Sequence, residues 1–159
     1  MHLRAITLAR LLALVVPAAL LAGAWGFELI GRLTPCEMCH WQRLPLYAAV
    51  PLALFGVATV HRPSLSRGFL LLVGLCLLMS GAIGAFHAGV EYHWWHGPTH
   101  CTAAVFAGSD PLKAILAAPI VRCDVAQWRL FGISLAGWNA LISIPVGLSI
   151  QLLCLKKSL

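Results

Sequence analysis

Apolar residues dominate four long stretches of this chain, and polar residues gather between them. The four stretches cover residues 11–30, 44–60, 68–89 and 137–155, and their interiors hold almost no charge. A helix that crosses a lipid bilayer needs about 20 mostly apolar residues, so each stretch predicts a membrane-spanning helix. Pro45 and Pro51 interrupt the second stretch, but neighbouring helices allow prolines inside a membrane.

Polar residues between the spans predict two loops on one side of a bundle and a short loop on the other. The first two cover residues 31–43 and 90–136, and the short one covers residues 61–67. In the long loop, Asp110 and Pro111 fit the N-cap and the first position of a short helix. The apolar residues that follow, as far as Ala118, predict a helix that lies on the membrane surface or covers the end of the bundle.

Composition agrees with a membrane protein of one domain. Hydrophobic residues make up 60% of the chain and charged residues only 10%, whereas soluble domains have about 25% charged residues. The four spans use most of the sequence. We therefore predict a single domain over residues 1–159, an all-α four-transmembrane-helix bundle with two loops on one side, the second of them long and with a short interfacial helix.

The distribution of charge predicts how the bundle is oriented. Lys and Arg in short flanking segments mark the cytoplasmic side, and here they are Arg4, Arg10, Arg62, Arg67, Lys156 and Lys157. All five acids fall on the other side, and so do all six tryptophans, as an interfacial aromatic belt would. Both termini are thus predicted to be cytoplasmic. The net charge of +6 fits this rule and anionic lipid, so it requires no nucleic-acid partner.

The first span also has features of a signal peptide that is removed. Arg4 and Arg10 precede the apolar run, and Ala22-Gly23-Ala24 resembles a cleavage site. We expect an uncut helix instead, because the apolar character continues through Ile30 and further spans follow.

Two cysteine pairs are the candidate chemistry. Cys36 and Cys39 form a C-x-x-C motif at the start of the second span, and Cys101 and Cys123 lie in the long loop. Two pairs on one side of a membrane favour a relay of electrons. The alternative is that Cys101 and Cys123 form only a structural disulfide, which would stabilise the loop by about 3 kcal/mol. The remaining two cysteines, Cys76 and Cys154, lie within spans and are predicted to act as small apolar residues.

The C-x-x-C pair has a setting that favours a thiolate. Thr34-Pro35-Cys36-Glu37 predicts a capped helix start with Thr34 as the N-cap, and the first turn of a helix stabilises a negative charge. Arg43 lies on the same helical face as both cysteines. Its guanidinium fits a role beside a thiolate or a bound carbonyl. The alternative is an arginine that extends to the lipid headgroups.

Two other kinds of site match parts of the sequence. Cys36, Cys39 and His40 make a C-x-x-C-H motif, the signature of a covalently attached c-type haem. No soluble haem-enclosing segment surrounds it, and haem leaves the second cysteine pair unexplained. A cluster in the long loop has ligands typical of zinc or copper, His93, His96, His100 and Cys101. Its spacing is loose, and we expect no metal.

In combination, these motifs resemble the DsbB family of bacterial membrane thiol:quinone oxidoreductases. The resemblance rests on Pro35-Cys36-x-x-Cys39-x-x-x-Arg43 after a first span, on the later cysteine pair, and on Leu130-Phe131-Gly132-Ile133-Ser134 before a fourth span. It covers nearly the whole chain. It implies a four-helix bundle in the inner membrane that reoxidises the periplasmic thioredoxin-like protein DsbA.

The resemblance also implies roles for single residues. Cys101 would form a mixed disulfide with the DsbA-like partner, Cys123 would be its disulfide partner, and electrons would pass through Cys36 and Cys39 to ubiquinone or menaquinone. Arg43, His87 and Glu91 would contact the quinone. His87 and Glu91 are four residues apart, so they can share a helical face, where they would alternatively support only each other.

A quinone also agrees with what the sequence lacks. There is no flavin, iron–sulfur or nucleotide motif to receive two electrons. A small lipid-soluble acceptor needs only an apolar cleft between helices with a few polar groups.

Overall fold

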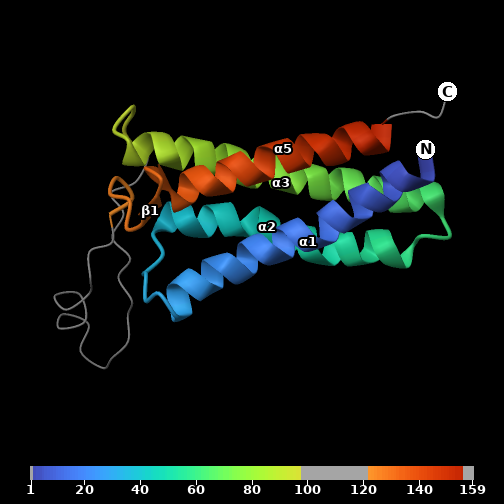
Figure 1. Cartoon of the computed structure of the whole chain (residues 1–159), viewed down its shortest axis with the longest axis horizontal. Helices are drawn as coiled ribbons and strands as arrows, with labels where there is room; N and C mark the ends of the chain where they lie inside the picture. Colours follow the sequence, from blue (N-terminus) through green and yellow to red (C-terminus); the bar gives the residue numbers. More distant parts are fainter. Residues whose placement is uncertain (1, 98–121, 156–159) are drawn as a thin grey trace.

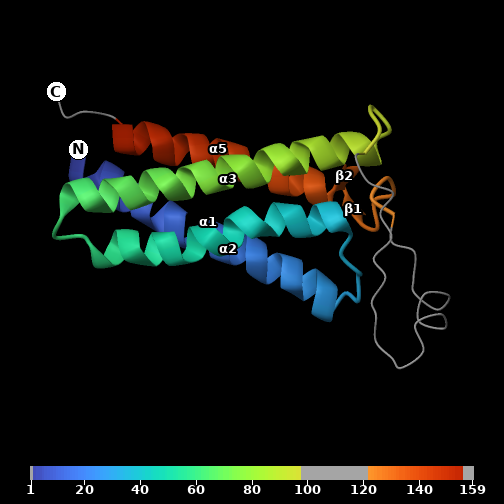
Figure 2. The ribbon, with the colours of Figure 1, turned by 180° about the vertical axis from the view of Figure 1, so that it is seen from behind.

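Four long helices and a short hairpin make up the described part of the chain. The structure is a computed structural model that describes residues 2–97 and 122–155 (Figure 1). The helices are α1 (His2–Leu29), α2 (Glu37–Ala58), α3 (Pro63–Glu91) and α5 (Leu135–Leu155). They lie side by side along the long axis of the molecule in both views (Figures 1 and 2). The short helix predicted after Pro111 lies outside the described residues.

Each predicted span falls almost entirely within one of these helices, but the helices are longer. α2 begins at Glu37, so residues 37–43 of the predicted first loop are helical. Three segments are long and apolar enough to cross a membrane, Ala5–Leu29, Pro63–Glu91 and Leu135–Leu155. α2 is less apolar because Glu37, Gln42 and Arg43 lie near its start.

Helix α3 lies between α2 and α5 and packs extensively against both. Small residues allow the close approach of α3 and α5. A Cβ atom on Gly81 would lie 2.6 Å from Cγ1 of Ile144, and one on Gly147 would lie 2.9 Å from the carbonyl oxygen of Gly74. Such glycines are typical of helix pairs in membranes, where close backbone contact contributes the packing energy.

The two ends of the bundle differ in chemistry. The start of α1, the α2–α3 connection and the end of α5 lie at one end (Figures 1 and 2). The opposite end holds the α1–α2 connection, the end of α3 and the hairpin. All six tryptophans lie in or near the parts of the helices and connections that meet at this second end, and the C-x-x-C motif lies there too. We refer to it as the thiol end.

The hairpin was not predicted from the sequence. β1 (Arg129–Leu130) pairs in antiparallel fashion with β2 (Ile133–Ser134). Both residues of its two-residue turn have positive φ, 53° at Phe131 and 78° at Gly132, as a type I′ turn requires. The hydroxyl of Tyr92 donates to the Gly132 carbonyl at 3.0 Å and accepts from the Ser134 N–H at 3.1 Å. The end of α3 therefore holds the hairpin in place.

The segment before the hairpin is fixed to the α1–α2 side of the bundle. Gln127 Nε2 donates to the Thr34 carbonyl at 2.7 Å. The ring of Trp128 packs on Phe27 with 4.9 Å between centroids. These two contacts help to hold the same segment, which includes Cys123 four residues before Gln127, over the start of α2.

Candidate active site

The sulfur of Cys36 caps helix α2. Cys36 has extended backbone angles, and its Sγ accepts a hydrogen bond from the Cys39 N–H at 3.3 Å. The predicted capping box with Thr34 as N-cap is therefore wrong. Thr34 lies two residues before the cap, and its carbonyl instead accepts from Gln127. The prediction that both cysteines lie at the start of a helix is confirmed.

Cys36 and Cys39 are free thiols joined by a hydrogen bond. Their sulfur atoms are 3.0 Å apart, with Cys36 as the donor. This hydrogen bond raises the pKa of Cys36, together with burial, and it lowers the pKa of Cys39 below its usual value. Arg43 contributes a smaller lowering at Cys39. The pair thus favours a thiolate on Cys39, the cysteine on the side of Arg43.

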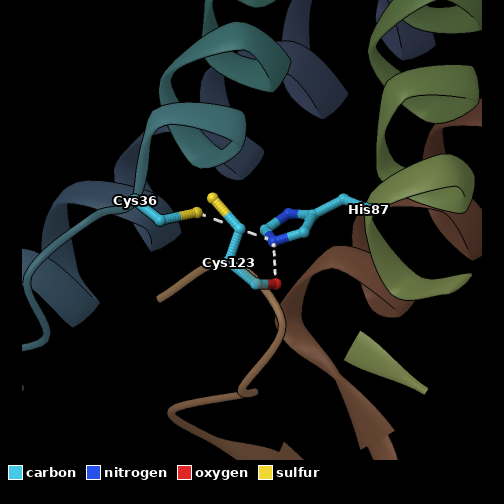
Figure 3. A group of neighbouring side chains, drawn as sticks. All are labelled: Cys36, His87 and Cys123. Carbon is cyan, nitrogen blue, oxygen red and sulfur yellow. Dashed lines mark hydrogen bonds between the residues drawn. The ribbon is translucent and has the colours of Figure 1, made fainter. Parts of the chain in front are cut away.

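Cys123 comes to the same place from the far end of the chain. It is buried and disulfide-bonded, whereas Cys36, Cys39, Cys76 and Cys154 are free. Its Sγ, the Cys36 Sγ and a ring nitrogen of His87 all lie within 4.8 Å of one another (Figure 3). Cys101, the predicted partner of Cys123, lies outside the described residues.

His87 faces the sulfur atoms. Its Nε2 is 3.6 Å from Cys36 Sγ and 3.2 Å from the carbonyl oxygen of Cys123 (Figure 3). Glu91 lies one turn further along α3, with Oε1 at 3.8 Å from the same nitrogen. His87 and Glu91 therefore share one face, as their spacing predicted, and both side chains are buried.

Arg43 is buried within the bundle. Its guanidinium forms an ion pair with Glu28 near the end of α1 and donates to the Ala24 carbonyl at 3.3 Å. Only 11% of the Arg43 side chain is exposed. This placement differs from that of an arginine extended to lipid headgroups.

A cavity of about 350 Å³ adjoins these groups. Apolar residues form most of its wall, and many of them belong to α1 and α5. The polar groups on the wall include Glu28, Cys39, Gln42, Arg43 and Glu91. Among the described residues, no partner binds Glu91 Oε2, although that atom is buried. The cavity can therefore accept a largely apolar molecule that offers a polar group to Glu91.

The alternative sites receive less support from the geometry. His40, the axial ligand of a haem reading, is exposed on α2. Of the proposed metal cluster in the long loop, His100 and Cys101 lie outside the described residues. The trio of Cys36, His87 and Cys123 has the spacing of metal ligands. It can bind a metal only when the disulfide of Cys123 is reduced, because metal ligation requires the thiolate.

Three polar residues at the site were missed in the sequence. They are Glu28, Gln42 and Asn139. A useful signal was available, since polar side chains within otherwise apolar spans are candidates for function. Gln42 Nε2 lies 2.7 Å from Nδ1 of His87, and Asn139 donates to Gln42 at 2.9 Å.

Comparison with known proteins identifies a family. The family described as disulfide bond formation protein DsbB matches residues 6–153. A disulfide bond formation protein B from Polaromonas sp. is 32% identical over 150 residues, which cover 87% of this chain and 86% of the relative. The proteins of that name from Methylococcus capsulatus and Nitrosomonas eutropha are each 29% identical, with 86% and 92% of this chain covered and 87% and 93% of theirs.

No solved structure matches the chain. The family match nevertheless spans all four long helices and every cysteine discussed above except Cys154. The chain therefore belongs to the DsbB family, whose members are membrane proteins that act as protein-disulfide oxidoreductases.

Proposed function

We propose that the protein transfers two electrons from a periplasmic, DsbA-like thioredoxin-fold partner to a membrane quinone, ubiquinone or menaquinone, and so generates disulfides. One observation carries this proposal. A free thiol, Cys36, lies within 4.8 Å of the disulfide-bonded Cys123 and 3.0 Å from Cys39. Three sulfur atoms that meet in this way can exchange disulfides in sequence.

The same proposal includes four membrane spans in the bacterial inner membrane. α2 has 22 residues and is about 33 Å long at a rise of 1.5 Å per residue. That length matches the hydrocarbon core of a bilayer. Among the described residues, the acids and tryptophans gather at the thiol end, so this end would face the periplasm and both termini the cytoplasm.

Electrons would enter through the disulfide that contains Cys123. In the order implied by the family, the partner forms a mixed disulfide with Cys101, which releases Cys123 as a thiolate. Cys123 then attacks Cys36 in a Cys36–Cys39 disulfide. A Cys36–Cys123 bond forms, the Cys36–Cys39 bond breaks, and the electron pair leaves on Cys39.

The cavity beside Cys39 fits a quinone headgroup. A bound quinone supplies an acceptor for two electrons and two protons. The mostly apolar wall suits such a ring, the Arg43 guanidinium can donate to a ring carbonyl, and Glu91 Oε2 can accept from a hydroxyl of the reduced ring. Glu91 is suited to bind a polar hydrogen there, and Glu28 fixes the position of Arg43.

The test is quinone reduction by the purified, lipid-reconstituted protein with a reduced thioredoxin-fold partner. We expect quinone absorbance to fall in step with oxidation of the partner, two electrons for each. A visible spectrum serves as the check on the alternative. A Soret band from covalent haem, or no quinone reduction with any dithiol partner, would contradict the proposal.

Replacing Arg43 with Ala should raise the apparent quinone KM about ten- to a hundred-fold. The reason is the loss of one charge-assisted hydrogen bond, worth about 1.5–3 kcal/mol. Thiol exchange with the partner should stay nearly normal, since Arg43 contacts Glu28 and Ala24 and no described atom of Cys36 or Cys123. Steady-state kinetics with quinone as the varied substrate measures this.

The matched control for this variant is Arg10→Ala. Arg10 is also an arginine of the bundle, but it donates to Ser66 at the end opposite the thiols. Its removal should leave the quinone KM unchanged. Equal kinetics for Arg43→Ala and Arg10→Ala would show that Arg43 has no part in quinone binding.

A further inference from the structure

Two buried side chains, Gln42 and His87, and the half-buried Asn139 form a chain of hydrogen bonds from α5 to the sulfur atoms. Asn139 Nδ2 donates to Gln42 Oε1 at 2.9 Å, and Gln42 Nε2 lies 2.7 Å from His87 Nδ1. Gly84 makes room for this pair of amides, because a Cβ atom on Gly84 would lie 3.1 Å from Gln42 Oε1 and 3.0 Å from Asn139 Nδ2. These hydrogen bonds join α5, α2 and α3 at His87, which faces Cys36 and Cys123.

Backbone carbonyls fix the direction of both amides. Asn139 Nδ2 lies 3.2 Å from the carbonyl oxygen of Ser80, and Gln42 Nε2 lies 3.3 Å from that of Met38. A carbonyl oxygen only accepts hydrogen bonds, so the amide atom that faces it must be the NH₂ group. Each amide is thus oriented by its own carbonyl, independently of the other.

This direction determines the tautomer of His87. Since Gln42 presents an N–H to Nδ1, that ring nitrogen must be the unprotonated acceptor. The proton of the neutral ring then lies on Nε2, which faces the Cys123 carbonyl at 3.2 Å and Cys36 Sγ at 3.6 Å. Both of these groups can accept a hydrogen bond, so the tautomer agrees with its surroundings at both nitrogens.

We propose that Gln42 and Asn139 are positioning residues that hold His87 with its proton on Nε2, aimed at the sulfur of Cys36, so that the imidazole stabilises Cys36 as a thiolate during disulfide exchange with Cys123. This inference rests on the proposed relay. It gives His87 a role toward the thiols, beyond the quinone contact expected from the sequence.

The exchange step replaces one disulfide bond with another. When a thiolate attacks Cys123 in a Cys36–Cys123 disulfide, a new bond to Cys123 forms and the Cys36–Cys123 bond breaks. The electron pair leaves on Cys36, with no net oxidation. In the reverse direction the Cys36 thiolate is the attacking group. The Cys36 thiolate is thus the leaving group in one direction and the attacking group in the other. The Nε2–H of His87 stabilises it in both directions.

The charged and titratable groups around His87 are compatible with a neutral donor. Glu91 Oε1 on the same helix lies 3.8 Å from Nε2, Cys36 faces the ring from the start of α2, and Cys123 faces it from the loop before the hairpin. A second proton on Nδ1 would meet the N–H of Gln42. The amide chain therefore opposes an imidazolium, and a neutral ring can donate from Nε2 without releasing its proton.

The tautomer can be read directly by nitrogen NMR. In the full-length protein labelled with ¹⁵N-histidine, with His87→Asn used to assign the signals, we expect His87 Nδ1 to be unprotonated and Nε2 protonated. In Gln42→Glu, a carboxylate replaces the donor and should draw a proton onto Nδ1, which shifts that resonance to the protonated range. Protonated Nδ1 in the unchanged protein, or identical His87 signals in both proteins, would overturn the proposal.

The effect on exchange is measured with Gln42→Met, which keeps the size but removes the donor. We expect kcat for partner-driven quinone reduction to fall about ten- to a hundred-fold with both KM values unchanged, as for one lost hydrogen bond to a charged group. An unchanged kcat would overturn the role of Gln42. The NMR result needs neither partner nor quinone, so it stands even if the unchanged protein fails to reduce quinone, which would refute only the relay.

Gln151→Glu is the matched control for the spectra. Gln151 is likewise a partly buried glutamine whose Nε2 donates to a backbone carbonyl, that of Leu71, at 2.9 Å. It joins α5 to α3 without contact to His87. The His87 signals should be the same in this variant as in the unchanged protein. A shift as large as that of Gln42→Glu would overturn the specific role of Gln42.

Discussion

Replacing Cys123 with Ala is expected to abolish quinone reduction by the thioredoxin-fold partner, a loss of at least about a thousand-fold. Cys123 is the described residue that brings the loop disulfide to Cys36, within 4.8 Å. Without it, electrons from the partner have no sulfur through which to reach the C-x-x-C pair. The measurement is the initial rate of quinone reduction with reduced partner.

A small dithiol separates this loss from a general failure of the protein. Dithiothreitol can reduce a Cys36–Cys39 disulfide directly, so Cys123→Ala should still reduce quinone with dithiothreitol at a rate near that of the unchanged protein. Cys76→Ala, which removes a cysteine within α3, should be normal with both reductants. Partner-driven turnover that survives in Cys123→Ala would show that the loop disulfide is only structural.

Replacing Cys39 with Ala is expected to stop quinone reduction with either reductant and to leave Cys36 cross-linked to Cys123. Cys39 is the sulfur that releases Cys36, at 3.0 Å in the structure. In its absence the Cys36 thiolate can still attack the disulfide of Cys123, and no neighbouring thiol within the C-x-x-C motif can break the new bond. Peptide mapping under non-reducing conditions after acid quenching identifies that bond.

The double variant Cys39→Ala and Cys123→Ala supplies the control for the cross-link. It keeps Cys36 but removes the disulfide that Cys36 would attack, so the Cys36 peptide should appear as a free thiol. If Cys39→Ala gave no Cys36–Cys123 peptide and instead bound the partner directly through Cys36, the proposed order of transfer would be incorrect.

The sequence predicted the helices and the position of the C-x-x-C pair because both signals are local. Long apolar runs gave all four helices, and the C-x-x-C motif gave two neighbouring thiols at a helix start. The predicted N-cap residue was wrong, because Cys36 caps α2 and Thr34 instead binds a distant residue. Its carbonyl binds Gln127, which is 93 residues away in the chain.

Contacts between distant residues account for most of what the sequence did not reveal. Gln42 and Asn139 are 97 residues apart, and each alone is an ordinary polar side chain in a helix. Their meaning depends on the close approach of three helices around Gly84. The hairpin is likewise too short to give a clear pattern in the sequence. Tyr92, at the end of α3, holds it in place through a hydrogen bond to the Gly132 carbonyl.

The capping of α2 by Cys36 makes the helix respond to the oxidation state of that residue. A sulfur that carries negative charge accepts the Cys39 N–H more strongly than a sulfur in a disulfide, and an N-cap interaction is worth about 1 kcal/mol. The first turn of α2 is therefore expected to be more stable when Cys36 is a thiolate than when it is part of a disulfide. Cys39 lies in that turn and Arg43 in the next one. In the proposed relay, the oxidation state of Cys36 would thus be coupled to the stability of the helix start that positions both residues.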